Sequence, residues 1–184
     1  MAKILLRAST EMARVSVLTG NRQVGKTTVC RETITLARAQ GDECGGILTL
    51  ARDGARDVYD VRSGEVRRLT QPPDAQPAVV QGRFRFNPET LRWAKEVLSQ
   101  SVPCDLLVID EIGPLEIERG AGWVTAFEVL HSRAFALAVV VVRPELVARA
   151  QLRLPGFAPT VLTATRDNRD SLPAVLIEML NRET

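Results

Sequence analysis

Residues 20–27 are the feature that most limits the fold of this chain, because they read GNRQVGKT and fit the pattern G-x-x-x-x-G-K-[ST] at every fixed position. The apolar residues 15–19 precede this segment with the pattern of a strand, and residues 26–40 follow it with the pattern of a helix that ends before Gly41. A strand that turns through such a loop into a helix directs backbone N–H groups and the positive helix terminus at an anion. The segment therefore predicts a phosphate-binding loop.

Every residue of the predicted loop is a candidate contact for a nucleotide. These candidates are Gly20, Asn21, Arg22, Gln23, Val24, Gly25, Lys26, Thr27 and Thr28. In loops of this pattern the lysine reaches the β- and γ-phosphates and the next hydroxyl binds Mg²⁺, so we assign Lys26 to catalysis and Thr27 to the metal. The alternative is a tight turn with a solvated lysine, but a cation at a helix N-terminus is unfavourable unless an anion is bound there. Arg22 and Gln23 either donate to phosphate or face solvent.

An acidic pair supplies the other half of the predicted site. Residues 105–110 read DLLVID, an apolar run ending in an acid, which is typical of a buried strand whose carboxyl end reaches a site. Asp110 is the candidate metal ligand, because a phosphate loop needs a carboxylate in addition to the loop hydroxyl to hold Mg²⁺. Glu111 is the candidate catalytic residue that polarises water for in-line attack on the γ-phosphorus. The alternative is that both acids merely close a strand and face solvent.

Residues 110–116, DEIGPLE, carry a resemblance to a known family. Together with the phosphate loop they resemble the THEP-type nucleoside-triphosphatase family, in which the loop is followed by DEIG-x-M-E. The segments GGILT at 45–49, GRF at 82–84 and NRD at 168–170 are similar to further segments of that family. The resemblance covers most of residues 15–181. It implies a RecA-like P-loop NTPase fold with an extra strand between the phosphate-loop strand and the Asp110 strand.

Three positions depart from the family pattern. Gln23 stands where the family usually has Gly, Leu115 replaces Met, and residues 50–52 read LAR in place of Glu-Val-Arg. The last change bears on the range of substrates and permits slow turnover. Arg52 and Arg56 remain candidates to stabilise charge on the transferring phosphoryl group, and solvated hairpin arginines are the alternative.

Further candidates come from the carboxyl ends of later elements. Arg143 follows the buried run ALAVVVV, so we expect it at the sheet edge where ligands of open α/β sheets bind, as a catalytic residue that senses the γ-phosphate. Asn168 and Arg169 precede the last helix. They either contact the base or ribose of the nucleotide or cap that helix.

Strand and helix patterns alternate along the chain. Strands are predicted at 15–19, 45–50, 105–110 and 136–142, and helices at 26–40, 88–100, around 123–130 and at 173–180. Ser63 and Gly64 indicate a β-hairpin over 57–69, and three prolines indicate an exposed loop over 71–81. We expect one α/β domain over 1–184, with residues 1–14 as an N-terminal extension. Its mostly parallel central sheet is flanked by helices and carries a β-hairpin insertion after the second strand.

Composition excludes several classes of protein. The 184 residues are 45% hydrophobic and 25% charged, which indicates a globular chain. The net charge of +2 is small and argues against nucleic acid as a partner. Three cysteines without a C-x-x-C pair indicate neither zinc nor disulfides, and reduced thiols suit the cytoplasm. The longest apolar run, 134–142, is far shorter than the roughly 20 residues that span a bilayer. We therefore expect a cytoplasmic protein with a nucleotide substrate and no membrane partner.

The leading functional hypothesis is a Mg²⁺-dependent nucleoside-triphosphatase. It would hydrolyse the β–γ phosphoanhydride of ATP, GTP and other triphosphates to the diphosphate and phosphate, and the lack of an [NT]-K-x-D motif disfavours guanine selectivity. One alternative is a nucleotide or small-molecule kinase, against which Glu111 argues because it suits water. Another is a nucleotide-switched binding module with little turnover. A corrinoid adenosyltransferase is disfavoured, because its phosphate loop is rich in glycine and lysine.

Overall fold

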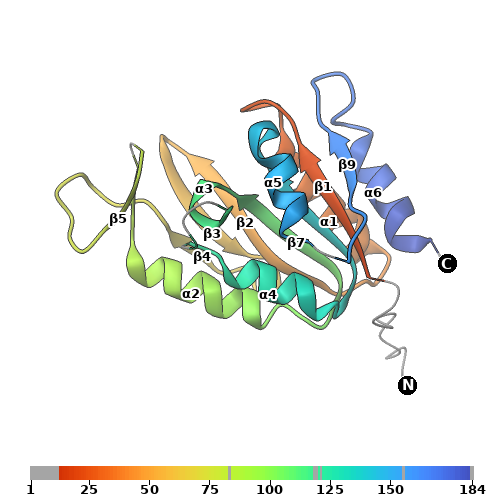
Figure 1. Cartoon of the computed structure of the whole chain (residues 1–184), viewed down its shortest axis with the longest axis horizontal. Helices are drawn as coiled ribbons and strands as arrows, with labels where there is room; N and C mark the ends of the chain where they lie inside the picture. The colour runs from red at the N-terminus through yellow and green to blue at the C-terminus, as the bar shows by residue number, and fades with distance from the viewer. Residues whose placement is uncertain (1–12, 83, 118–119, 121, 155, 183–184) are drawn as a thin grey trace.

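A seven-stranded sheet forms the centre of the molecule in the computed structural model, which describes residues 13–82, 84–117, 120, 122–154 and 156–182 (Figure 1). The strand order is β4-β3-β2-β7-β8-β1-β9. Strands β2, β7, β8, β1 and β9 run parallel, whereas β3 and β4 are antiparallel to their neighbours. Five parallel strands therefore bring their carboxyl ends to one edge of the sheet.

The elements have the following bounds. The strands are β1 (Arg14–Thr19), β2 (Cys44–Arg52), β3 (Ala55–Asp60), β4 (Val66–Arg68), β5 (Val79–Gln81), β6 (Phe84–Phe86), β7 (Cys104–Ile112), β8 (Phe135–Val142) and β9 (Thr160–Thr163). The helices are α1 (Lys26–Ala39), α2 (Pro88–Ser99), α3 (Pro114–Ile117), α4 (Thr125–Ser132), α5 (Val147–Leu152) and α6 (Leu172–Asn181), with a 3₁₀ turn at Pro144–Leu146.

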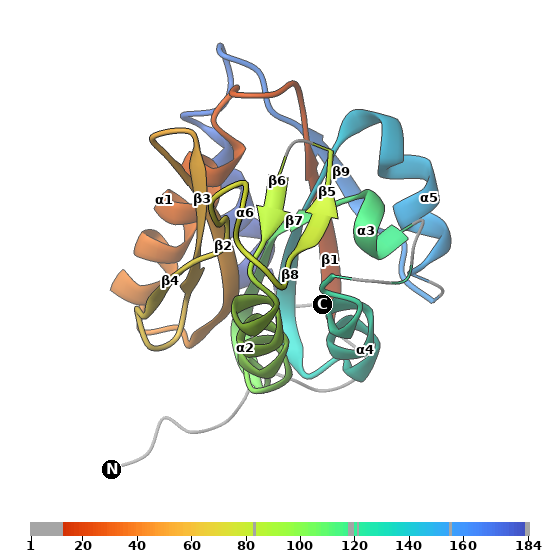
Figure 2. The same ribbon diagram turned by 90° about the vertical axis from the view of Figure 1, so that its left-hand side faces the viewer.

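The core has two layers, one on each face of the sheet. All eight residues of β8 are buried, and alternate residues of β7 and β8 face opposite sides. Helices α1 and α6 cover one face, and α2 and α4 cover the other together with β6 (Figure 2). Burial on both faces explains why the sequence of β8 is a continuous apolar run instead of an alternating one.

The predicted fold class is confirmed. The central sheet is mostly parallel and flanked by helices, and β8 lies between β1 and β7, where the resemblance places an extra strand. The helices predicted at 26–40, 88–100 and 173–180 correspond to α1, α2 and α6. The single-domain assignment stays a prediction. Of the predicted N-terminal extension 1–14, residues 1–12 lie outside the described residues, and Arg14 already belongs to β1.

The boundary predicted for the end of the second strand is wrong, whereas the predicted hairpin is present as β3 and β4. The second strand does not end at residue 50; β2 continues to Arg52 and turns into β3 through Asp53 and Gly54, both of which have positive φ. Asp-Gly is a turn dipeptide that closes a hairpin, so the predicted hairpin over 57–69 is the second turn of a three-stranded antiparallel meander.

The loop predicted over 71–81 is also too long. Its last residues form β5, which pairs with β6 in a separate two-stranded sheet. The prolines lie at 72, 73 and 77, so they leave the backbone N–H groups of Val79 and Val80 free to pair. The edge strand β9 was missed because its sequence, TVLT, is short and largely exposed and gives no apolar pattern. The helices α3 and α5 were also not predicted, because they are too short to show a helical pattern of apolar residues.

Candidate active site

The phosphate loop joins the end of β1 to the start of α1. Gly20 has a φ of 139°, and a Cβ at this position would lie 2.4 Å from the carbonyl oxygen of Ala164, so only glycine fits. Gln23 also has a positive φ, 60°, although it carries a side chain. This conformation explains why the family pattern has glycine there, because a residue with a Cβ is strained in the left-handed region. Thr28 is exposed on the first turn of α1.

The ammonium group of Lys26 lies across the loop. Its Nζ donates hydrogen bonds to the carbonyl oxygens of Gly20 at 2.7 Å and Asn21 at 2.8 Å. Burial lowers the pKa of Lys26, and the nearby carboxylates of Glu111 and Asp110 act in the opposite direction. The charge therefore lies within the loop and close to both acids of the DEIG motif.

The predicted metal ligands are in direct contact. Thr27 Oγ1 donates a hydrogen bond to Asp110 Oδ2 at 2.7 Å, which ties the start of α1 to the carboxyl end of β7. Asp110 is buried, and burial raises its pKa to about 6, although the bond from Thr27 acts to lower it. Thr49 Oγ1 donates to the backbone carbonyl of Asp110 and fixes that end of β7.

A hydroxyl and a carboxylate oxygen together are a donor set that fits Mg²⁺, which prefers oxygen ligands and keeps few protein ligands beside substrate phosphates. Among the residues that the structure describes, no group of three or more His, Cys, Asp or Glu side chains gathers to hold a metal by itself. The Thr27–Asp110 pair is thus suited to a metal that arrives with a triphosphate.

Glu111 forms its ion pair with a different residue from the one that its neighbour Asp110 contacts. Its Oε1 accepts a hydrogen bond from Arg143 Nε at 2.5 Å, in an ion pair whose side chains are 23% and 32% exposed respectively. Burial acts to lower the pKa of Arg143, but the hydrogen bond and charge of Glu111 outweigh it and raise that pKa. Because β7 and β8 are parallel neighbours, their carboxyl ends place these two residues together.

Asn168 and Arg169 precede α6, and neither side chain caps that helix. Asn168 Oδ1 accepts from the backbone N–H of Thr165, and its Nδ2 donates to the carbonyl of Thr163. Asn168 therefore braces the turn after β9 and does not cap α6, whose first residue follows Ser171. Arg169 packs against the loop, with its Cδ 3.1 Å from where a Cβ of Gly25 would lie.

Two cavities flank the phosphate loop. The Glu111 cavity, of about 370 Å³, is bounded by Glu111, Arg143 and Arg56 together with aromatic side chains. The β9 cavity, of about 690 Å³, is bounded by residues 19–24, the turn after β9 and Pro144. Arg22 lines both cavities, whereas the exposed Arg52 lines neither. The structure thus brings Arg56 and Arg143 together and leaves Arg52 outside the site.

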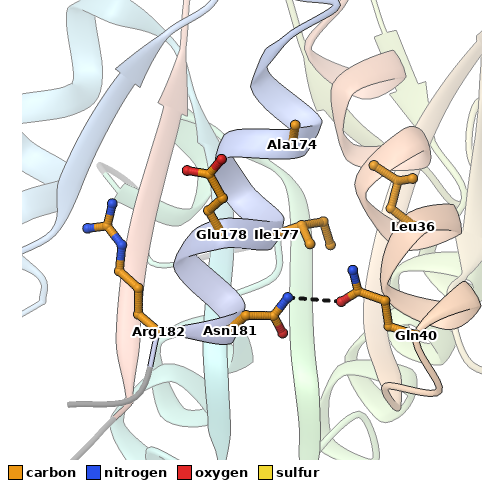
Figure 3. A pocket seen from close by; sticks show the side chains of 7 residues that line it. All are labelled: Leu36, Gln40, Ala174, Ile177, Glu178, Asn181 and Arg182. Carbon is orange, nitrogen blue, oxygen red and sulfur yellow. Dashed lines mark hydrogen bonds between the residues drawn. The ribbon is translucent and has the colours of Figure 1, made fainter.

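A third hollow, of about 660 Å³, lies between α1 and α6 (Figure 3). Asn181 Nδ2 donates to Gln40 Oε1 across it at 3.0 Å, and Leu36 and Ile177 form its apolar part. No predicted site residue lines this hollow.

Glu116 is a functional candidate that the residue-level reasoning missed. It is buried, and its two carboxylate oxygens accept the backbone N–H groups of Gly113 at 2.8 Å and Trp123 at 3.0 Å. Burial raises the pKa of Glu116, and both hydrogen bonds act in the opposite direction. Glu116 thereby fixes the segment that forms one wall of the Glu111 cavity. An acid flanked by apolar residues in GPLEI was the available signal.

Comparison with known proteins agrees with this geometry. The family model described as NTPase matches residues 15–177 of the chain. The chain belongs to this NTPase family. Two relatives named nucleoside-triphosphatase THEP1 are similar to this NTPase-family chain. The protein of Methanosarcina acetivorans is 34% identical over 169 residues, 88% of this chain and 93% of the relative. The protein of Methanopyrus kandleri is 28% identical over 178 residues, with 88% and 92% covered.

Two solved structures share the fold of this NTPase-family chain. The crystal structure of THEP1 from the hyperthermophile Aquifex aeolicus has a TM-score of 0.68 at 20% identity and covers 91% of this chain and 99% of its own. The solution structure of a human cancer-related nucleoside triphosphatase has a TM-score of 0.68 at 22% identity, with 92% and 100% covered. The resemblance drawn from the DEIG motif is confirmed. In the described part of the chain, no helix has both the length and the apolar character to cross a membrane.

Proposed function

We propose that this chain is a Mg²⁺-dependent nucleoside-triphosphatase that hydrolyses the β–γ phosphoanhydride of ATP, GTP and other triphosphates to the diphosphate and orthophosphate. One observation carries the proposal. Asp110 and Glu111 are consecutive in the chain, yet Asp110 contacts Thr27 at the metal position whereas Glu111 contacts Arg143 at the edge of a cavity. Two adjacent carboxylates are thereby separated into a metal ligand and a base. The predicted cytoplasmic location goes with this proposal.

In the proposed reaction, the loop N–H groups and Lys26 bind the β- and γ-phosphates. Thr27 and Asp110 would hold Mg²⁺, which when bound would neutralise charge on the phosphate oxygens. Glu111 then accepts the proton of the attacking water, and its carboxylate is oriented for this by Arg143. Because Arg143 stays charged, it also stabilises charge that develops on the γ-phosphoryl group.

We infer the direction of the bound triphosphate from the two cavities. Glu111 lines the Glu111 cavity and not the β9 cavity, which supports a γ-phosphate that faces the former. The nucleoside then lies toward the β9 cavity, beside the turn that Asn168 braces. Arg169 supports the loop from behind in this arrangement, so its effect on nucleotide binding is indirect.

Release of phosphate and of diphosphate from ATP, GTP, CTP and UTP, measured with and without Mg²⁺, tests the proposal. We expect Mg²⁺-dependent release of the two products in equal amounts. Lys26→Ala is the matching variant, and it should abolish tight triphosphate binding in calorimetry, because the loop amides alone neutralise the phosphate charge poorly. Binding without turnover would support the nucleotide-switched module instead. Unchanged affinity in a folded Lys26→Ala protein would remove the phosphate loop from the mechanism.

A further inference from the structure

The Glu111 cavity has a lining that neither a hydrolytic water nor the γ-phosphate would use in full. It measures about 370 Å³, which lies within the range typical of small-molecule pockets. Its walls include Phe84 and Phe86, whose rings have no polar atom to bond a water, together with Trp123. A pocket of this size with aromatic walls and a few polar groups is typical of a site for a small organic molecule.

The aromatic wall of the cavity has a cation beside it. The rings of Phe84 and Phe86 are stacked, with centroids 6.1 Å apart and planes inclined by 10°. The guanidinium of Arg56, which projects from β3, lies 5.0 Å from the centroid of Phe84. An organic ligand that enters the cavity therefore meets aromatic side chains beside a positive charge, which favours a ligand that combines an apolar ring with an anion.

The charges of the cavity favour an anion. Arg22, Arg56 and Arg143 line it with two acids, Glu111 and Glu116. Glu111 is paired with Arg143, and both oxygens of Glu116 are taken by backbone N–H groups. Among the residues that the structure describes, no acid forms an ion pair with Arg22 or Arg56. These two guanidiniums can bind a carboxylate or phosphate group on a ligand.

We propose that the Glu111 cavity is a phosphoryl-acceptor subsite, in which this chain transfers the γ-phosphoryl group of a triphosphate to the hydroxyl of a small, ring-bearing anion. The proposal rests on the function proposed above, because it uses the same phosphate loop and the same base. A bond forms between the hydroxyl oxygen and the γ-phosphorus, and the bond from the γ-phosphorus to the β–γ bridging oxygen breaks. The hydroxyl proton passes to Glu111, and the bond electrons leave with the nucleoside diphosphate. Hydrolysis is the same step with water in place of the acceptor.

The test measures nucleoside diphosphate and orthophosphate separately. Hydrolysis yields these two products in equal amounts, whereas transfer to an acceptor yields the nucleoside diphosphate without orthophosphate. The probes are 4-(hydroxymethyl)benzoate and the nucleoside 3′-monophosphates, which combine a ring, an anionic group and a free hydroxyl. Benzyl alcohol lacks the anion and glycerol phosphate lacks the ring. With γ-labelled ATP and Mg²⁺, we expect the ring-bearing anions to raise the diphosphate-to-orthophosphate ratio by roughly threefold or more, and the two control compounds to leave it near one. The labelled ester should be found by mass spectrometry.

Phe84→Leu and Phe157→Leu form a matched pair of variants. Phe157 is also partly buried, stacks on Phe135 with centroids 6.4 Å apart and lies under Arg133 at 4.3 Å, but it is not part of the cavity. Thermal unfolding checks that both variants fold. Loss of one ring contact should lower the excess of diphosphate about fivefold in Phe84→Leu, and Phe157→Leu should retain the wild-type ratio. An equal loss in both folded variants would overturn the subsite.

The remaining outcomes distinguish the two proposals. If orthophosphate and diphosphate are released in equal amounts with every probe, the acceptor subsite is overturned and the hydrolase stands. Equal stimulation of both products by a probe also overturns it, because the probe then acts as an effector of hydrolysis. If neither product forms under any condition, the proposed nucleoside-triphosphatase itself is wrong.

Discussion

The two cavities beside the phosphate loop differ in how they are built. The β9 cavity is bounded largely by two short stretches, residues 19–24 and 161–166, whose backbones follow directly from β1 and β9. The Glu111 cavity is bounded by single side chains from many elements, among them β3, β6, β7 and the residue after β8. Backbone geometry therefore determines the first, and side-chain packing determines the second. Substitutions should affect chemistry or selectivity mainly on the Glu111 side.

The largest effect is expected from Glu111→Gln. The amide keeps the shape of the side chain but loses the proton acceptor, so hydrolysis in single-turnover assays should fall by roughly 10² to 10⁴ with little change in nucleotide affinity. Asp110→Asn is the matched variant, and it should weaken Mg²⁺ dependence and binding of the metal-bound triphosphate instead. If Glu111→Gln hydrolyses as fast as wild type, the assignment of Glu111 as the base is wrong; if wild type hydrolyses nothing, the nucleotide-switched binding module is favoured instead.

Arg143→Ala should have the second-largest effect on turnover. It removes the partner of Glu111 and a cation at the γ-phosphate, so kcat should fall by about 10² with a smaller change in KM. Steady-state kinetics on Arg143→Ala, Arg56→Ala and Arg52→Ala compare the three candidate arginines. Arg52→Ala should match wild type, since Arg52 is exposed and outside both cavities. Equal losses in kcat and affinity for Arg143→Ala would contradict a role confined to the transition state.

Glu116→Gln should affect stability more than chemistry. The amide can accept one of the two backbone N–H groups but presents its own NH₂ to the other, and an unpaired buried donor costs roughly 1–3 kcal/mol. Denaturant unfolding should record that loss. Glu178→Gln, at an exposed position of α6, should leave the midpoint unchanged. A Glu116→Gln protein as stable as wild type would show that these two hydrogen bonds contribute nothing net.

The smallest effect is expected from Gln23→Gly. Relief of the left-handed conformation should stabilise the chain by about 1 kcal/mol, partly offset by the greater freedom of glycine in the unfolded state. Asn21→Gly in the same loop should destabilise it, because Asn21 does not have a positive φ. Thermal unfolding of both variants decides the matter. Destabilisation by Gln23→Gly would mean that contacts of the glutamine outweigh its strain.

The sequence predicted those parts of the site that depend on neighbouring residues. The phosphate loop, Asp110 and Glu111 are short contiguous motifs, and Arg143 directly follows a run whose burial on both faces is evident from its composition. The hydrogen bonds of Asn168 and Glu116 to backbone N–H groups were not predicted, because no pattern of residue types indicates them. The Glu111 cavity was also hidden, since Arg56 and Phe84 lie far apart in sequence.

Arg22 lines both cavities, and its side chain is exposed. In the proposed arrangement one triphosphate reaches into both cavities, so this single guanidinium borders both the γ-phosphate and the nucleoside. Its five N–H donors suit contacts on either side of the loop. If two ligands bind beside it at once, linkage requires each to change the affinity of the other by the same factor.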